Sequence, residues 1–517
     1  MIPRGSERQY LLLTASTILV WFTVSLVSLL HFPPWDATGD ESLFSALALS
    51  IFRGRMGVDY AFGSYLSKTG FGMLSPWLWG VIMGIPLRLF GETLWAARFI
   101  STLLATGAMV LVFLTAKEIA GPKAGFLATI LTGLAHTFCR WGAHSARAEG
   151  AIALFLMLSL WLVVLSMMRK KAWLSAIGGF TATISLLVRP TALFILPTLL
   201  IFLLVQKRFR ESGFLIIGAI LAGIIMLFTN ILPYHDMPTA EDIDRINKER
   251  FFPLGVIKNP RRLTELPSRL WQCCIFLTGY PDKDTSPGLL GILSLSGAFF
   301  KERRAGLWLT VSLALSLAVF IPYLAFFYLC FVVPPLAVFA AGTLSGLKNR
   351  HIKWLLGIII PILLIPWAKW PRDFLWNREK ARAWQEVERA IPPGARVVTG
   401  VWGLWWPLHK KAVFIWPYDT LYAEGRKSPQ DLVRETHGTH LIVPIAERPA
   451  LPPRGFRKND DPILRLWNMY YDYPEYVKAL PAAAVVREGF ILARIVSGPW
   501  RVDSLLILEI PEEDRGR

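Results

Sequence analysis

The sequence predicts a multi-pass α-helical membrane protein with about 11–13 transmembrane helices, followed by a C-terminal extracytoplasmic α/β domain. Hydrophobic residues make up 54% of the 517 residues and the mean hydropathy is +0.44, both high for a soluble domain. Apolar runs long enough to cross a hydrocarbon core recur up to residue 369. Beyond that point proline and charged residues become more frequent and the apolar runs become shorter. We therefore expect a membrane domain over 1–369 and a second domain over 370–517.

The membrane domain is predicted from apolar runs of roughly 18 to 20 residues, the length of helix that spans a bilayer. These runs are 10–31, 94–115, 124–141, 150–168, 172–188, 190–205, 213–232, 286–300, 305–321, 323–346 and 353–369. The first run is too long for the apolar part of a signal peptide and lacks a small-residue cleavage site, so it is predicted to be a true helix. Proline and glycine interrupt the stretch 73–90, which is predicted to be juxtamembrane or re-entrant.

The net charge of +18 does not indicate nucleic-acid binding, because the basic residues are confined to short connectors. If the helices alternate in direction, these connectors share one side with the N-terminus, which is the positive-inside pattern. The sequence therefore predicts a cytoplasmic (inner) membrane protein with a cytoplasmic N-terminus, outer loops at 32–93 and 233–285, and an outer domain at 370–517. The basic residues are Arg4, Arg8, Lys117, Lys123, Arg169, Lys170, Lys171, Lys207, Arg208, Arg210, Lys301, Arg303, Arg304, Lys348, Arg350 and Lys353.

The C-terminal domain is predicted to be α/β from short apolar stretches separated by turn residues. "ARVVTG", "THLIVPIA", "FILARIV" and "LLILEI" are typical of strands. "SPQDLVRETHG" is typical of a helix that Ser428 caps and Gly438 ends. The aromatic stretch "GVWGLWWPLHK" is predicted to pack in a core or at an interface.

The sequence predicts no cofactor and assigns no metal ligand, although it leaves a divalent metal open. The four cysteines, Cys139, Cys273, Cys274 and Cys330, form no metal-binding spacing. His235 and Asp236 could be ligands, but an isolated His-Asp pair is more typical of a solvated loop.

Charged residues at helix ends are the main candidates for function, because a charge near lipid costs free energy unless it has a partner, water or a task. Asp40 and Glu41 open the first outer loop. Arg140, His144 and Arg147 follow helical spacing at the outer end of the run 124–141, with Glu149 next. Arg189 stands where the run 172–188 stops, and Pro190 is suited to the first turn of the next helix.

These groups could meet, because the helices that carry them end at the outer membrane surface, at the depth of a lipid phosphate. Arginine binds phosphate with two parallel hydrogen bonds, and a carboxylate can take a proton from an attacking hydroxyl or amine. The pattern therefore favours group transfer from a lipid-linked phosphate donor.

Structural alternatives fit the same residues. Asp40 and Glu41 could cap a helix that begins in the first outer loop. Glu149 could form a structural salt bridge with Arg147 or Arg140, and Arg189 could be an interfacial anchor. Spacing does not decide between these alternatives and catalysis.

Four stretches resemble one family in their order along the chain. They are "GDESLFSALALSIFRG", "SPWLWGVIMGIPLRLFGETLWAARFIST", "HSARAEGAIALFLMLSL" and "LLVRPTALFILP". Over residues 10–205, and more loosely over the tail, the chain resembles the GT-C superfamily of membrane glycosyltransferases. The resemblance is greatest to bacterial aminoarabinose transferases of lipid A and to protein O-mannosyltransferases. The Trp-Trp-Asp-Tyr-Gly motif of the oligosaccharyltransferase branch is not matched, since Pro407 follows Trp406.

The resemblance implies a GT-C type fold and roles for particular residues. By position, Asp40 matches the catalytic base or acceptor-positioning aspartate, and Glu41 is its neighbour, an acceptor-binding or site-shaping residue. Glu149 matches the acidic residue of the second outer loop, where aspartate is commoner. The donor phosphate would be bound by Arg147 and Arg189, with Arg140 and Lys68 as further candidates.

The resemblance also implies a reaction. A monosaccharide, hexosyl or pentosyl, would pass with inversion from a polyprenyl-phosphate donor to a lipid, glycan or protein acceptor at the outer face. The alternative is a transporter or flippase of lipid-linked sugars. It would place its polar residues near the bilayer midplane, on internally repeated halves of the chain, and no such repeat is apparent.

Overall fold

The protein was analysed as a computed structural model, in which contacts divide the chain into two units that are described separately below. The first unit is Met1–His31 with Lys68–Trp370, and the second is Phe32–Ser67 with Pro371–Arg517. The structure describes residues 4–31, 39–53, 77–231, 256, 259–277, 286–296, 304–320, 328–369, 382, 384–399, 405–415, 437–445, 491–497 and 504–509.

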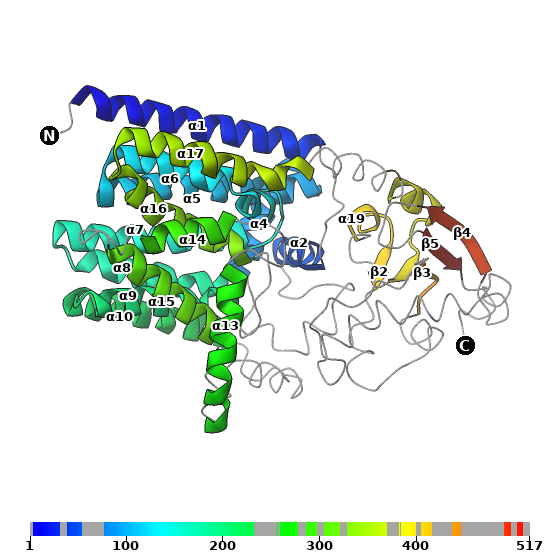
Figure 1. Ribbon diagram of the computed structural model, residues 1–517. Helices are drawn as coiled ribbons and strands as arrows, with labels where there is room; N and C mark the ends of the chain where they lie inside the picture. The colour runs from blue at the N-terminus through cyan, green and yellow to red at the C-terminus, as the bar shows by residue number, and fades with distance from the viewer. Residues whose placement is uncertain are drawn as a thin grey trace. The chain divides into compact units, whose positions relative to one another are not determined.

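The first unit is a bundle of apolar helices (Figure 1). Its helices are α1 (Arg4–His31), α4 (Trp77–Phe90), α5 (Leu94–Ala120), α6 (Pro122–Leu134), α7 (Glu149–Arg169), α8 (Trp173–Ile184), α9 (Ile195–Val205), α10 (Phe209–Met226), α13 (Leu266–Leu277), α14 (Ser286–Ser296), α15 (Arg304–Phe320), α16 (Leu329–Ser345) and α17 (Asn349–Leu364). Five stretches have the length and composition to cross a membrane, namely Glu7–Leu29, Leu94–Ala120, Glu149–Arg169, Phe209–Thr229 and Arg350–Trp367. The protein is therefore an integral membrane protein. Each predicted apolar run coincides with one or more of the helices of the first unit.

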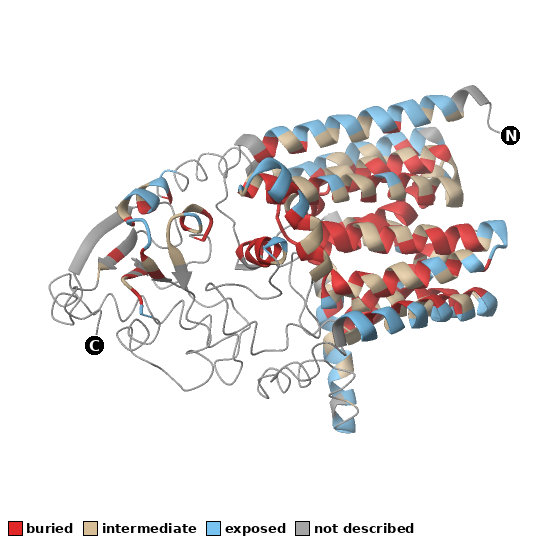
Figure 2. Ribbon diagram, turned by 180° about the vertical axis from the view of Figure 1, so that it is seen from behind, coloured by how far each residue is buried: buried red, intermediate tan, exposed pale blue. Residues whose placement is uncertain are grey.

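Helix α16 lies at the centre of the bundle. Every residue from Leu329 to Leu344 is buried, and the helix packs against α5, α6, α7 and α14. In contrast, α1, α10 and α17 expose apolar side chains such as Leu19, Ile220 and Trp354, so the buried residues gather inside the bundle (Figure 2). In a membrane protein the exposed apolar side chains face lipid.

Two ion pairs identify one end of the bundle. Lys117 Nζ lies 2.9 Å from Glu7 Oε1, and Arg169 Nη2 lies 3.4 Å from Glu118 Oε1. The start of α1 and the last turns of α5 and α7 therefore meet at this end, which we call the basic end. At the opposite end of α6, Trp367 Nε1 donates to Leu134 O over 2.9 Å. Since Trp367 follows α17, this helix begins at the basic end. The basic connector before α17 therefore lies at that end, as the positive-inside pattern predicts.

One predicted element differs from the structure. The run 124–141 is not one helix, since α6 ends at Leu134 and a π-helix, η1 (Phe138–Ala143), follows. Residues 144–148 then bend before α7 begins at Glu149. The helical spacing expected for Arg140, His144 and Arg147 is therefore wrong. The stretch 73–90 contains a regular helix, α4, which runs through Pro86 and packs on α5.

Helices α8 and α10 approach each other closely through glycines. A Cβ on Gly218 would lie 1.7 Å from Ala176 O, and one on Gly179 would lie 1.9 Å from Leu215 O. Small residues allow transmembrane helices this backbone contact.

We expect Gly218→Ala to destabilise the bundle by about 1–3 kcal/mol, because the new methyl group can be accommodated only by moving backbone. The measurement is the thermal unfolding midpoint of the detergent-purified protein. Gly213→Ala on the same helix is the control, since a Cβ there meets nothing within 4 Å. Equal midpoints for the two variants would contradict the close approach.

The second unit contains a mixed five-stranded sheet in the order β2-β1-β3-β5-β4. Its strands are β1 (Arg396–Thr399), β2 (Val413–Ile415), β3 (His440–Ile445), β4 (Ile491–Ser497) and β5 (Ser504–Glu509). Strand β1 is parallel to β2 and β3, whereas β5 is antiparallel to β3 and β4. The predicted strands are confirmed as β1, β3, β4 and β5. Strand β2, of 3 residues, was not predicted, and most of the helix expected over 428–438 lies outside the described residues.

The unit also contains α2 (Gly39–Phe52), so a helix is present in the first outer region, and Asp40 and Glu41 lie within its first turn. Ser45 Oγ donates to Glu41 O over 2.7 Å within this helix.

Candidate functional site

Hydroxyl groups of α5 hold the irregular connection between η1 and α7. Thr102 Oγ1 donates to Ala143 O over 2.8 Å, and Ser101 Oγ donates to Arg147 O over 3.4 Å. Backbone carbonyl groups without helical partners are costly in a membrane unless other groups bind them. The connection between Ala143 and Glu149 is thus fixed to the first turns of α5.

Gly150 brings the start of α7 close to η1. A Cβ at this position would lie 2.2 Å from Gly142 O and 3.2 Å from Ser101 O. Only glycine allows this approach, and it sets the position of the neighbouring Glu149.

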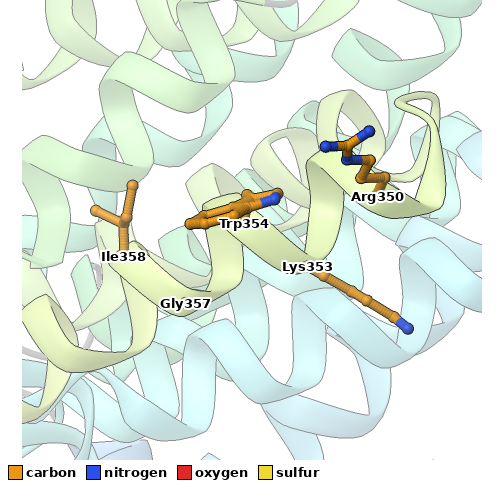
Figure 3. Close-up of a pocket in the computed structure, with 5 residues that line it drawn as sticks. All are labelled: Arg350, Lys353, Trp354, Gly357 and Ile358. Carbon is orange, nitrogen blue, oxygen red and sulfur yellow. The ribbon is translucent and has the colours of Figure 1, made fainter.

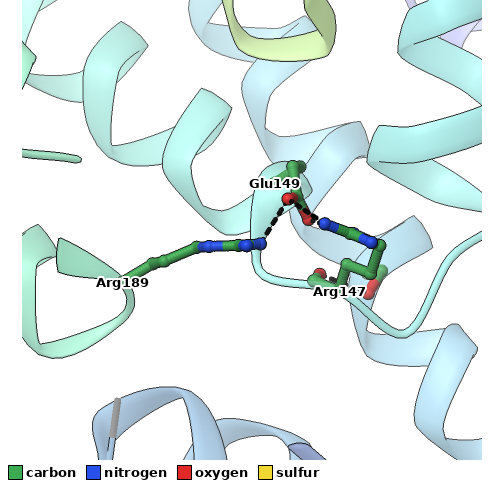
Figure 4. A network of polar contacts seen from close by, with 4 residues as sticks. Arg147, Glu149 and Arg189 are labelled. Atoms are coloured by element: carbon green, nitrogen blue, oxygen red, sulfur yellow. Dashed lines mark hydrogen bonds and ion pairs between the residues drawn. The ribbon is translucent and has the colours of Figure 1, made fainter. Parts of the chain in front are cut away.

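A buried charge cluster stands at the junction, formed by Arg147, Glu149 and Arg189 (Figure 4). Arg147 Nε and Nη2 donate to Glu149 Oε2 and Oε1 over 3.2 and 3.1 Å. Arg189 Nη1 donates to Glu149 Oε1 from the other side of the carboxylate. Arg189 is placed for this contact by the break between α8 and the 3-10 helix η3 (Pro190–Phe194), where its backbone is extended.

The cluster is almost inaccessible to water and carries one excess positive charge. The exposed fraction is 0% for Glu149, 2% for Arg147 and 9% for Arg189. A buried carboxylate with a positive partner avoids most of the cost of an isolated charge. The two guanidinium groups also provide the paired N–H donors that bind an oxyanion such as phosphate.

Aromatic rings cover both arginines. The Arg147 and Arg140 guanidinium carbons lie 5.8 and 4.8 Å from the centroid of the Trp141 ring. The Arg189 guanidinium carbon lies 5.6 Å from the centroid of the Tyr328 ring. Such contacts favour a cation, most strongly where water is excluded. The geometry therefore keeps both cations in place beside Glu149.

Arg98, Trp141 and Tyr328 were not among the predicted site residues. Arg98, in the first turns of α5, is 6% exposed. Burial, with Arg98 and His136 nearby, lowers the pKa of His144 to about 3, so this imidazole is neutral at physiological pH. Trp141 and Tyr328 could not be found from spacing, since they act through ring contacts that depend on the bundle. Trp141 lies within η1, and Tyr328 immediately precedes α16.

The structure brings together three of the predicted residues, Arg147, Glu149 and Arg189, although they lie up to 42 positions apart. The salt bridge that was one alternative for Glu149 is present with Arg147, and a second is formed with Arg189. Arg140 approaches the cluster through Trp141.

The other predicted residues belong to the first outer region. Glu41 is fully buried, with an exposed fraction of 0%. Asp40 is the second residue of α2, and its side chain lies outside the described residues, as does Lys68. Since α2 belongs to the second unit, the expected approach of Asp40 to the cluster stays a prediction.

No group of three or more His, Cys, Asp or Glu side chains is placed to hold a metal ion in the described part of the chain. His235 and Asp236 lie outside that part.

Comparisons with known proteins agree with this architecture. Residues 74–232 match the family described as dolichyl-phosphate-mannose-protein mannosyltransferase. No curated protein matches the chain.

Among solved structures, ArnT from Cupriavidus metallidurans bound to undecaprenyl phosphate is similar, with 12% identity, a TM-score of 0.61 and 98% of each chain covered. Its apo state gives a TM-score of 0.55, again with 12% identity, and covers 97% of this chain and 98% of that one. The oligosaccharyltransferase AglB from Archaeoglobus fulgidus, in complex with an inhibitory peptide and a dolichol-phosphate, gives a TM-score of 0.50 with 13% identity, covering 83% of this chain and 69% of that one.

The family match over residues 74–232 and the fold similarity to ArnT agree with the resemblance noted in the sequence. The chain has a GT-C fold, and it resembles the lipid A aminoarabinose transferases and the mannosyltransferases, as its sequence predicted.

Proposed function

We propose that the protein is a glycosyltransferase that moves a monosaccharide from a polyprenyl-phosphate donor to an acceptor, with inversion. The observation that carries this proposal is the buried cluster of Arg147, Glu149 and Arg189, since guanidinium groups bind phosphate through paired hydrogen bonds. The solved structures of similar fold support it, since one is bound to undecaprenyl phosphate and another to a dolichol-phosphate.

In the proposed reaction the acceptor hydroxyl or amine attacks the anomeric carbon of the sugar. The bond from that carbon to the phosphate oxygen breaks, and the polyprenyl phosphate leaves with the electron pair. Asp40 takes the proton of the acceptor, while Arg189 and Arg147, with Arg140 and Lys68 as further candidates, stabilise the phosphate that departs. Glu41 helps to shape the acceptor side.

The proposal includes an orientation in the membrane. We place the basic end in the cytoplasm of a cell whose inner membrane contains the protein, with domain 370–517 on the extracytoplasmic side and domain 1–369 in the bilayer. The acceptor would be lipid A, another glycolipid, a cell-wall polymer or a protein. Fusing a reporter that is active only outside the cytoplasm after residue 517 would test the orientation, and an inactive reporter would contradict it.

The reaction is tested with protein reconstituted in proteoliposomes and a panel of radiolabelled polyprenyl-phosphate sugars. We expect one donor to pass its label to an acceptor in a membrane extract. A flippase would instead move labelled donor between leaflets and leave the sugar on its lipid, so this outcome would favour the alternative.

Asp40→Asn is expected to lower sugar transfer at least about 100-fold, because the amide cannot take the acceptor proton. The measurement is the initial rate of label transfer, with the amount of membrane-inserted protein held equal. Asp59→Asn, in the same predicted outer region, is the control and should retain its rate. Full activity in Asp40→Asn would remove Asp40 from the proposed role.

A further inference from the structure

A hollow on the surface of α17 lies apart from the charge cluster. It is lined by Arg350, Lys353, Trp354, Gly357 and Ile358, and its volume is about 560 Å³ (Figure 3). These residues form two adjacent rows on one side of the helix, since their spacings are three and four. The hollow lies in the first turns of α17, at the basic end of the bundle.

The hollow is cationic where α17 begins and apolar further along the helix. Arg350 and Lys353 belong to the first two turns of α17, and both are exposed. Among the residues that the structure describes, no acidic side chain lines the hollow. Trp354 is 70% exposed and Ile358 is 56% exposed, further along a stretch that can span the membrane.

Gly357 creates space beside Trp354. A Cβ at this position would meet nothing within 4 Å, so the space is not required for packing against another helix. Glycine in a helix costs about 1 kcal/mol relative to alanine. A groove beside an exposed tryptophan is of use only if something occupies it.

We propose that this hollow binds an anionic phospholipid of the bilayer. The phosphate group contacts Arg350 and Lys353, and one acyl chain lies over Gly357 between Trp354 and Ile358. The order of charge and apolar surface along α17 matches the order of head group and acyl chain in a phospholipid. Cations near the membrane surface attract anionic lipids, and aromatic side chains are common at the level of the head groups.

The test uses the full chain in detergent, with phosphatidylglycerol or phosphatidylcholine added at equal concentration and bound lipid counted by native mass spectrometry. We expect phosphatidylglycerol to remain bound preferentially. Arg350→Gln/Lys353→Gln should bind it about 25-fold less tightly, since each cation near an anionic surface contributes about fivefold. Gly357→Leu, which keeps both charges, should also lose the lipid by filling the hollow.

Two controls make the result specific. Lys171→Gln/Arg210→Gln removes two other exposed cations, and Gly223→Leu fills open space on α10. Both should bind phosphatidylglycerol as the unmodified protein does. An equal loss in the charge control would overturn the proposal in favour of general attraction to the basic end. Unchanged binding in Gly357→Leu would overturn it as well.

Discussion

Glu149→Ala is expected to abolish sugar transfer and to destabilise the membrane unit by about 3–5 kcal/mol. Glu149 is fully buried, and it is the carboxylate that both Arg147 and Arg189 contact. Its removal leaves two buried cations side by side, which is far costlier than the loss of a surface ion pair. Glu149→Asp should be milder, because it keeps the charge and moves the carboxylate by one methylene group.

The measurements are the rate of label transfer and the thermal unfolding midpoint in detergent. A double variant separates the structural from the catalytic contribution. Glu149→Ala/Arg189→Ala restores the net charge of the cluster, so we expect it to regain stability relative to Glu149→Ala but to remain inactive. Recovery of transfer in the double variant would show that Glu149 is only a structural partner of Arg189.

Gly150→Ala is expected to lower sugar transfer by about 100-fold, because a displacement of about 1 Å at a reacting site is enough for such a loss. The added Cβ would lie 2.2 Å from Gly142 O and 3.2 Å from Ser101 O, and both contacts are to backbone. The start of α7 must therefore move away from α5 and η1, carrying Glu149 with it. The accompanying loss of stability should be about 1–3 kcal/mol.

Gly142→Ala is the matched control. A Cβ there would lie 3.6 Å from the Phe138 ring and 3.9 Å from Cys330 Cβ, which are ordinary contacts. It should retain both the transfer rate and the unfolding midpoint. If Gly150→Ala behaved like this control, the approach of α7 to η1 would not position Glu149.

The membrane helices could be predicted because apolar length is a local property. Each predicted run coincides with helical structure, and four of the strands in the second unit follow from local alternation and turn residues. The break after Leu134 could not be predicted, because the run 124–141 is apolar on both sides of it. The irregular connection that follows is held by Ser101 and Thr102, which donate to Arg147 O and Ala143 O from more than 40 positions earlier in the chain.

Part of the candidate site could also be predicted, because it depends on local features of the sequence. Arg147, Glu149 and Arg189 were singled out because charge at the end of an apolar run is costly, and the bundle does bring them together. The contacts of Trp141 and Tyr328 with the arginines depend on how separate helices pack, which spacing along the sequence does not contain. The expected place of Asp40 beside the cluster rests on the resemblance and on the shared outer position of the helix ends, and it stays a prediction.

The two arginines contact Glu149 unequally, and this difference affects how the proposed site would bind its donor. Arg147 holds the carboxylate through two nitrogen atoms, whereas Arg189 contacts it through one. In the function proposed here, Glu149 occupies the place of an anion beside both guanidinium groups until the donor binds. In the proposed reaction the donor phosphate replaces Glu149 at Arg189, so the affinity for the donor is a difference between two similar contacts and not the full strength of either. In the proposed reaction this exchange limits the affinity for polyprenyl phosphate, so the product can dissociate.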